Sequence, residues 1–95
     1  MEGYRNAMLA RRDGRPEEMI KTIDTQGTAR KIKQAIEHSG YDIRQISEIF
    51  GFSTPQAVYK WTQGKSLPNI DNLLILAHIT GKKLDDLIAL REEKS

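Results

Sequence analysis

Side chains that can form hydrogen bonds are concentrated in the short segment from residue 54 to residue 63: Thr54, Gln56, Tyr59, Lys60 and Gln63. Their spacing of three or four positions places most of them on one side of a helix. A Gln amide can form paired hydrogen bonds with adenine, a Lys ammonium can reach guanine, and a Tyr ring can pack on a thymine methyl group. These residues predict contacts with the edges of DNA bases; the alternative is an ordinary solvated helix face.

A second set of side chains has the chemistry to hold phosphate groups: Arg30, Lys33, Arg44, Lys65 and Ser66. Lys65 and Ser66 follow Gly64 and precede another predicted helix, where backbone amides without helical partners attract anions. Phosphate contacts position a protein on a duplex, whereas base contacts give specificity. We therefore predict that the second set positions the protein on DNA and that the first set gives sequence specificity.

The sequence contains no comparable pattern of residues for catalysis or for metal binding. His38 and His78 lie on different predicted helices, neither has carboxylate partners at metal-ligand spacing, and the chain has no cysteine. No serine lies in a nucleophile motif, and the glycines are spaced as helix ends rather than as a nucleotide-binding loop. We therefore predict no enzyme, no catalytic residue, no metal and no cofactor.

Glycines separate the helical segments that must position these residues. Gly40, Gly51, Gly64 and Gly81 each follow a run with helical periodicity, as expected of left-handed residues that end helices. The pattern predicts five helices between residues 28 and 90.

The starts of these helices can be predicted from capping residues. The first helix covers residues 29–39, and the second begins at Asp42, which can form a capping box with Gln45. The third has Ser53 or Thr54 as its N-cap and Pro55 at its first helical position. Its apolar residues are expected to face inward: Ala57, Val58 and Trp61.

The fourth predicted helix, residues 70–80, is capped by Asn69 and is apolar nearly all round. It has more apolar side chains than one buried stripe requires. The surplus and the apolar residues of a fifth helix could form a self-association surface: Leu74, Ile75, Ile79, Leu84, Leu87, Ile88 and Leu90. The alternative is that the fourth helix packs centrally in a small domain.

Length and composition limit the domain organisation. A chain of 95 residues has room for one domain, and its 15 Lys and Arg against 13 Asp and Glu give a net charge of +2. No apolar run approaches the roughly 20 residues that span a membrane, so a soluble cytoplasmic protein is expected. We predict a mobile N-terminal arm over residues 1–27, a domain over 28–91 and a tail over 92–95; Met19 is an alternative natural start.

Four blocks in this order and spacing resemble the phage repressor and Cro type of helix-turn-helix, the XRE family: residues 51–53, 57–61, 64–77 and 84–87. The resemblance implies an all-α fold, a compact five-helix repressor-like domain. It also implies sequence-specific binding of double-stranded DNA, by a homodimer on a palindromic operator, and a role in transcription control as a repressor. No small-molecule ligand or membrane partner is predicted.

The sequence departs from the family pattern at three places. The segment from Gly51 to Val58 is one residue longer than usual, Ile43 stands where many relatives place a phosphate-binding Gln, and Ile36 and Thr62 replace a charged pair. The net charge of +2 and Ile43 support an alternative function, a protein-interaction module such as an antitoxin or assembly factor.

Overall fold

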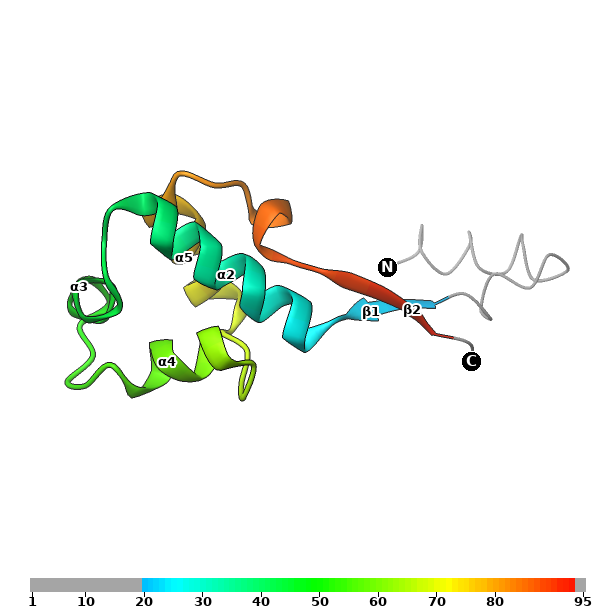
Figure 1. Ribbon diagram of the computed structural model, residues 1–95, viewed down its shortest axis with the longest axis horizontal. Helices are drawn as coiled ribbons and strands as arrows, with labels where there is room; N and C mark the ends of the chain where they lie inside the picture. The colour runs from blue at the N-terminus through cyan, green and yellow to red at the C-terminus, as the bar shows by residue number, and fades with distance from the viewer. Residues whose placement is uncertain (1–19, 94–95) are drawn as a thin grey trace, which may run out of the picture.

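A computed structural model describes residues 20–93, in which a group of helices carries a two-stranded ribbon (Figure 1). The elements follow in the order β1 (Ile20–Ile23), α2 (Thr25–Ser39), α3 (Ile43–Phe50), α4 (Gln56–Gln63), α5 (Ile70–Thr80), the 3₁₀ helix η3 (Leu84–Leu87) and β2 (Leu90–Glu93). In Figure 1 the ribbon extends from the helical body on the side away from α3.

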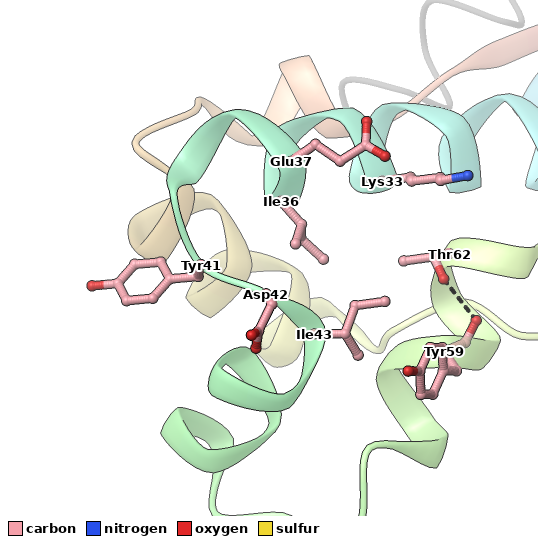
Figure 2. Close-up of a pocket in the computed structure, with 8 residues that line it drawn as sticks. All are labelled: Lys33, Ile36, Glu37, Tyr41, Asp42, Ile43, Tyr59 and Thr62. Carbon is pink, nitrogen blue, oxygen red and sulfur yellow. Dashed lines mark hydrogen bonds between the residues drawn. The ribbon is translucent and has the colours of Figure 1, made fainter.

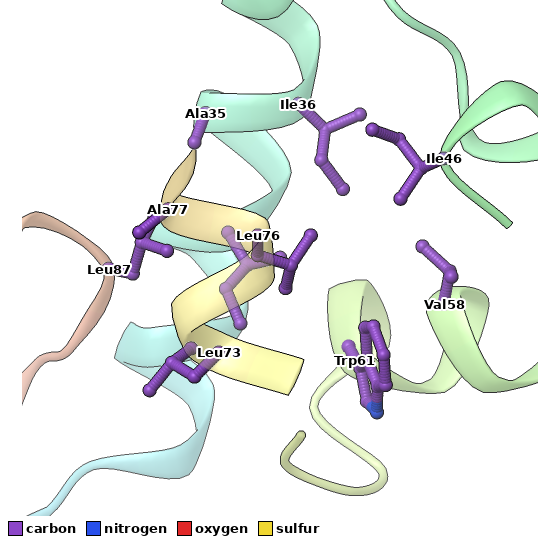
Figure 3. Packing of buried hydrophobic residues seen from close by; sticks show 10 residues of the cluster. Ala35, Ile36, Ile46, Val58, Trp61, Leu73, Leu76, Ala77 and Leu87 are labelled. Carbon is purple, nitrogen blue, oxygen red and sulfur yellow. The ribbon is translucent and has the colours of Figure 1, made fainter. Parts of the chain in front are cut away.

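The core lies between the helices, and every helix and η3 contributes to it (Figure 3). The buried apolar cluster consists of Ile32, Ala35, Ile36, Ile46, Val58, Trp61, Leu73, Leu76, Ala77 and Leu87. Val58 and Trp61 are buried as predicted, while Ala57 is half-buried and packs against the cluster. Because its inner side is held by this core, α4 has a fixed orientation.

Local capping fixes the starts of α3 and α5 as the sequence predicted. The Gln45 amide donates to Asp42 Oδ1 at 2.8 Å, and the Asp42 amide donates to Gln45 Oε1 at 2.9 Å, which completes the capping box. The Asn72 amide donates to Asn69 Oδ1 at 2.8 Å at the start of α5.

The predicted all-α fold with five helices is wrong at the C-terminal end. Residues 20–93 contain four α-helices, and the segment expected as the fifth forms η3 and then the strand β2. The strand β2 pairs antiparallel with β1, with Ile20 opposite Glu93 and Ile23 opposite Leu90.

Tertiary hydrogen bonds explain why the chain leaves the helical path after Leu87. The Asp24 amide donates to the Ala89 carbonyl at 2.9 Å, and the Ala89 amide donates to Thr28 Oγ1 at 3.0 Å. These bonds occupy backbone groups that a continued helix would have used internally. The apolar periodicity of residues 84–90 is therefore overridden by pairing with the start of the domain.

The helix α2 begins earlier than the predicted first helix. Asp24 is its N-cap and accepts a hydrogen bond from the Gly27 amide at 3.1 Å, so the expected boundary between residues 27 and 28 falls inside α2. Residues 1–19 of the expected arm, including Met19, and residues 94–95 of the expected tail lie outside the described residues. Within the described part, no helix is both long and apolar enough to cross a membrane.

Candidate nucleic-acid interface

The connection between α3 and α4 sets where α4 begins. Gly51 ends α3 with φ 80°, and the Phe52 amide donates to the Ser47 carbonyl at 3.0 Å. The predicted N-cap at Ser53 or Thr54 is wrong by one or two residues, because Pro55 is the N-cap and α4 starts at Gln56. Pro55 has ψ 9°, outside the helical range, and its carbonyl accepts the first helical hydrogen bond, from the Tyr59 amide at 3.0 Å.

Three aromatic rings join this connection to α4. Phe50 stacks on Phe52 with ring centroids 5.1 Å apart. Both meet Trp61 edge to face, at 5.4 Å and 6.0 Å. Such ring pairs contribute about 0.5 to 1.5 kcal/mol beyond their buried area. The cluster therefore holds the turn and the inner side of α4 together.

The outer side of α4 is polar and exposed. Gln56, Tyr59, Lys60 and Gln63 are exposed, and Thr54 is exposed just before the helix. Val58 and Trp61 on the opposite side are buried. The arrangement leaves the five predicted base-reading side chains open to solvent, on an element that the core holds in place.

Residues from both predicted sets meet in a hollow on one flank of α4. Thr54, Gln56 and Lys60 line it together with Ser66 from the loop after α4. Phe52 and Ser53 of the turn form the remaining wall with Ala57. Sequence reasoning did not assign Phe52 or Ser53 to the site, because their position depends on the path of the turn.

A second, mostly apolar hollow lies on the other flank of α4 (Figure 2). It brings Tyr59 of α4 together with Lys33 of α2. Figure 2 shows Ile36 and Ile43 pointing into the space between the helices. Thr62 also lines this hollow, and its hydroxyl donates to the Tyr59 carbonyl at 2.9 Å. Ile36 and Thr62 thus form part of a wall that contains no unpaired buried polar atom among the described residues.

The loop after α4 differs from the predicted anion site. The amides of Gly64, Lys65 and Ser66 all donate to the Lys60 carbonyl, the last two at 3.0 and 3.5 Å. These three loop amides are therefore already engaged within the protein, so the part of the predicted anion site that depends on them is wrong. The side chains of Lys65 and Ser66 remain exposed.

A contact from α2 supports the same loop. Gln26 Nε2 donates to the Gly64 carbonyl at 3.2 Å. This role of Gln26 was not predicted, because Gln26 lies in the segment that was expected to be a mobile arm. The bond connects the end of α4 to the first turn of α2.

The remaining predicted phosphate residues are spread over two helices. Arg30 and Lys33 are exposed on α2, and Arg44 is exposed in the first turn of α3. Of these three, Lys33 lies beside the outer side of α4, at the second hollow. Arg30, Arg44, Lys65 and Gln63 are exposed but line neither hollow. Over residues 20–93, no three His, Asp or Glu side chains are grouped as a metal site.

A protein-family model described as "Helix-turn-helix" matches residues 32–87 of the chain. The match covers more than half of the 95 residues and extends from within α2 to the end of η3. It leaves the ribbon of β1 and β2 outside. No curated protein and no solved structure matches the chain.

Proposed function

The chain belongs to the XRE-type helix-turn-helix family of DNA-binding transcription regulators, and on this basis we propose that it binds double-stranded DNA sequence-specifically with α4 in the major groove. The observation that carries the proposal is the exposed polar side of α4, opposite the buried Val58 and Trp61. The major groove accommodates one α-helix and displays a distinct donor and acceptor pattern for each base pair. A helix held by the core on one side and polar on the other suits that groove.

The proposed base contacts come from the exposed side of α4 and the residue before it: Thr54, Gln56, Tyr59, Lys60 and Gln63. Gln56 lies in the first turn of α4, where side chains of a groove-bound helix approach base edges most closely. Its amide group can donate to and accept from adenine at the same time. Gln56 is therefore the main candidate for direct readout.

The proposed phosphate contacts surround α4: Arg30, Lys33, Arg44, Lys65 and Ser66. Lys33 approaches from α2 beside Tyr59, and Ser66 approaches from the loop beside Lys60. Contacts on both flanks of α4 would fix its register on the two strands that border one groove. Because occupancy of a promoter can itself block transcription, the proposed regulatory role is repression.

The proposal is tested by fluorescence anisotropy at two salt concentrations. One set of DNA duplexes has random sequences, and the other set is first selected from a random pool for binding to the protein; these are called selected duplexes. We expect tight binding to selected duplexes, weaker binding to random ones, and a loss of both as salt rises, because bound phosphates release counterions. Absence of binding to every duplex at low ionic strength would contradict it.

A protein-interaction module is the second candidate function. It is favoured by the outer side of α5, where Ile70 is 66% exposed and Leu74 is 50% exposed. It is also favoured by Ile43 in the first turn of α3, which cannot bind phosphate through its side chain. Under this function the same titration gives weak binding that does not distinguish selected from random duplexes.

A further inference from the structure

The ribbon of β1 and β2 has two outer edges, and no third strand pairs with either edge within residues 20–93. Two-stranded ribbons are marginally stable alone, and unpaired edges are templates for another strand. The ribbon also exposes apolar side chains, since Ile23 is 44% exposed and Leu90 is 57% exposed. These features indicate that an additional strand could be accommodated.

The register identifies which backbone groups of β1 point outward. The Asp24 amide, one position beyond β1, points toward the other strand, because it donates to the Ala89 carbonyl at 2.9 Å. Hydrogen-bonded and non-hydrogen-bonded pairs alternate along an antiparallel ladder. Counting back along β1, Ile23 and Lys21 therefore direct their amides and carbonyls away from β2, and Thr22 directs its own toward β2.

We propose that the outer edge of β1 pairs antiparallel with β1 of a second copy of this chain, about a two-fold axis at Thr22. In this register Lys21 lies opposite Ile23 of the second copy, and the reverse pair forms at the same time. Each pair exchanges two backbone hydrogen bonds. The result is a closed dimer with a continuous sheet of four strands in the order β2, β1, β1, β2.

Charge and backbone geometry together favour this register on the β1 edge. A two-fold axis at Ile23 would require the backbone of Thr25, which belongs to α2. A two-fold axis at Lys21 would place two ammonium groups opposite each other, which is unfavourable. The axis at Thr22 places Lys21 opposite an apolar residue, and Glu92 remains its partner within the same ribbon. Ile23 would then lie between Leu90 of its own ribbon and the aliphatic stem of the second copy's Lys21, which would cover its exposed surface.

The outer edge of β2 is less suitable for the same pairing. An axis at Arg91 or at Glu92 places like charges opposite each other. An axis at Leu90 would require the backbone of Ile88, whose carbonyl accepts from Lys31 Nζ at 3.1 Å and whose amide donates to Asp85 at 3.4 Å. The β1 edge is thus the one with compatible charges and available backbone groups.

Proline substitutions on the two edges test which one associates, and they are measured by analytical ultracentrifugation of the full chain without DNA. In Lys21→Pro and Glu92→Pro the proline replaces an amide that points outward, so the bonds between β1 and β2 are kept. We expect the wild type and Glu92→Pro to dimerise, and the dissociation constant of Lys21→Pro to rise at least about tenfold. Lys21→Gln, which keeps the amide but removes the charge, should dimerise like the wild type.

A monomeric wild type at every concentration, or a Lys21→Pro dimer as stable as the wild type, would overturn the proposal. Cysteine crosslinking gives an independent answer if the proline variant does not fold. The chain has no cysteine, so Thr22→Cys is expected to form a disulfide across the two-fold axis, where the two Cα atoms of a non-hydrogen-bonded pair lie about 4.5 Å apart. Arg91→Cys, on the far strand, should not crosslink, and equal crosslinking of both variants would contradict the register.

The inference goes beyond the proposed function and can fail separately from it. If the protein is a monomer that binds selected duplexes, only the proposed dimer is overturned. If it is a dimer that binds no duplex, only the proposed DNA binding is overturned. If both hold, the selected DNA sites should be palindromic, because the two-fold axis relates two copies of α4.

Discussion

The rings of Phe50 and Trp61 meet edge to face, with centroids 5.4 Å apart and planes at 73°. This contact joins the last turn of α3 to the inner side of α4. The orientation of the outer side of α4 therefore depends on the half-buried Phe50 and the buried Trp61, which belong to the core side of the two helices.

Replacement of Phe50 by Leu is expected to reduce the free energy of unfolding by about 1 to 2 kcal/mol, because the ring contacts with Phe52 and Trp61 are lost. Urea denaturation followed by fluorescence measures the effect, since Trp61 is the chain's single tryptophan. Tyr41→Leu, at an exposed position, serves as the control and should change stability by less than about 0.5 kcal/mol. Equal effects of the two changes would show that the ring cluster contributes nothing.

The hydroxyl of Thr28 is expected to stabilise the junction between α2 and β2. It accepts from the Ala89 amide at 3.0 Å and donates to the Ala89 carbonyl at 3.4 Å, and Thr28 is buried. Thr28→Val should lower the free energy of unfolding by about 1 to 3 kcal/mol, because the Ala89 amide loses its partner. Thr80→Val is the control: its hydroxyl donates only to carbonyls of its own helix, so about 0.5 kcal/mol or less is expected. A larger loss in the control would refute this explanation.

Gly64 and Gly81 both have left-handed backbones, with φ of 75° and 71°, but different surroundings. A Cβ at Gly64 would lie 2.5 Å from Gln26 Nε2, whereas a Cβ at Gly81 would meet nothing within 4 Å. Gly81→Ala should cost about 1 to 2 kcal/mol through backbone strain. Gly64→Ala should cost about 0.5 to 1.5 kcal/mol more, because the Gln26 hydrogen bond is displaced.

A double-mutant cycle isolates the role of Gln26 at this loop. In a Gln26→Ala background the bond to the Gly64 carbonyl is already absent, so Gly64→Ala should cost no more than Gly81→Ala. Thermal or urea unfolding of the four variants gives the coupling energy. If the extra cost of Gly64→Ala persisted without Gln26, strain in the loop would have another cause.

Gln56 and Lys65 should contribute to DNA binding in different ways. Gln56→Ala is expected to weaken binding by about 1 to 3 kcal/mol on selected duplexes and to relax preference at one or two base pairs. Lys65→Ala should weaken selected and random duplexes alike and reduce the slope of affinity against salt. Anisotropy titrations over a salt series distinguish these outcomes; identical behaviour of the two variants would reject the division of labour.

Features that depend on neighbouring residues were predicted from the sequence. The capping box of Asp42 and Gln45, the cap at Asn69 and the buried Trp61 were all confirmed. Each follows from spacing within about one helical turn. The family resemblance was also confirmed, because its motifs extend over most of the helical body.

Features that depend on distant residues were not predicted. The four residues of β1 give too short a pattern to indicate a strand, and their partner lies at the other end of the domain. Residues 84–90 have a periodicity that fits a helix, but the bonds to Asp24 and Thr28 hold Ala89 in extended structure. The sequence also did not predict that three amides donate to the Lys60 carbonyl, because this arrangement depends on the path of the loop after α4.

The pairing of Thr28 with Ala89 also has a consequence for the order of folding. The two residues are separated by 61 positions, so the entropy of a long loop must be lost before their hydrogen bonds form. The turns of α3 and α5 instead close within a few positions, which is a faster process. Folding should therefore begin among the central helices, and the amides of β2 should be the last to become protected from exchange with solvent.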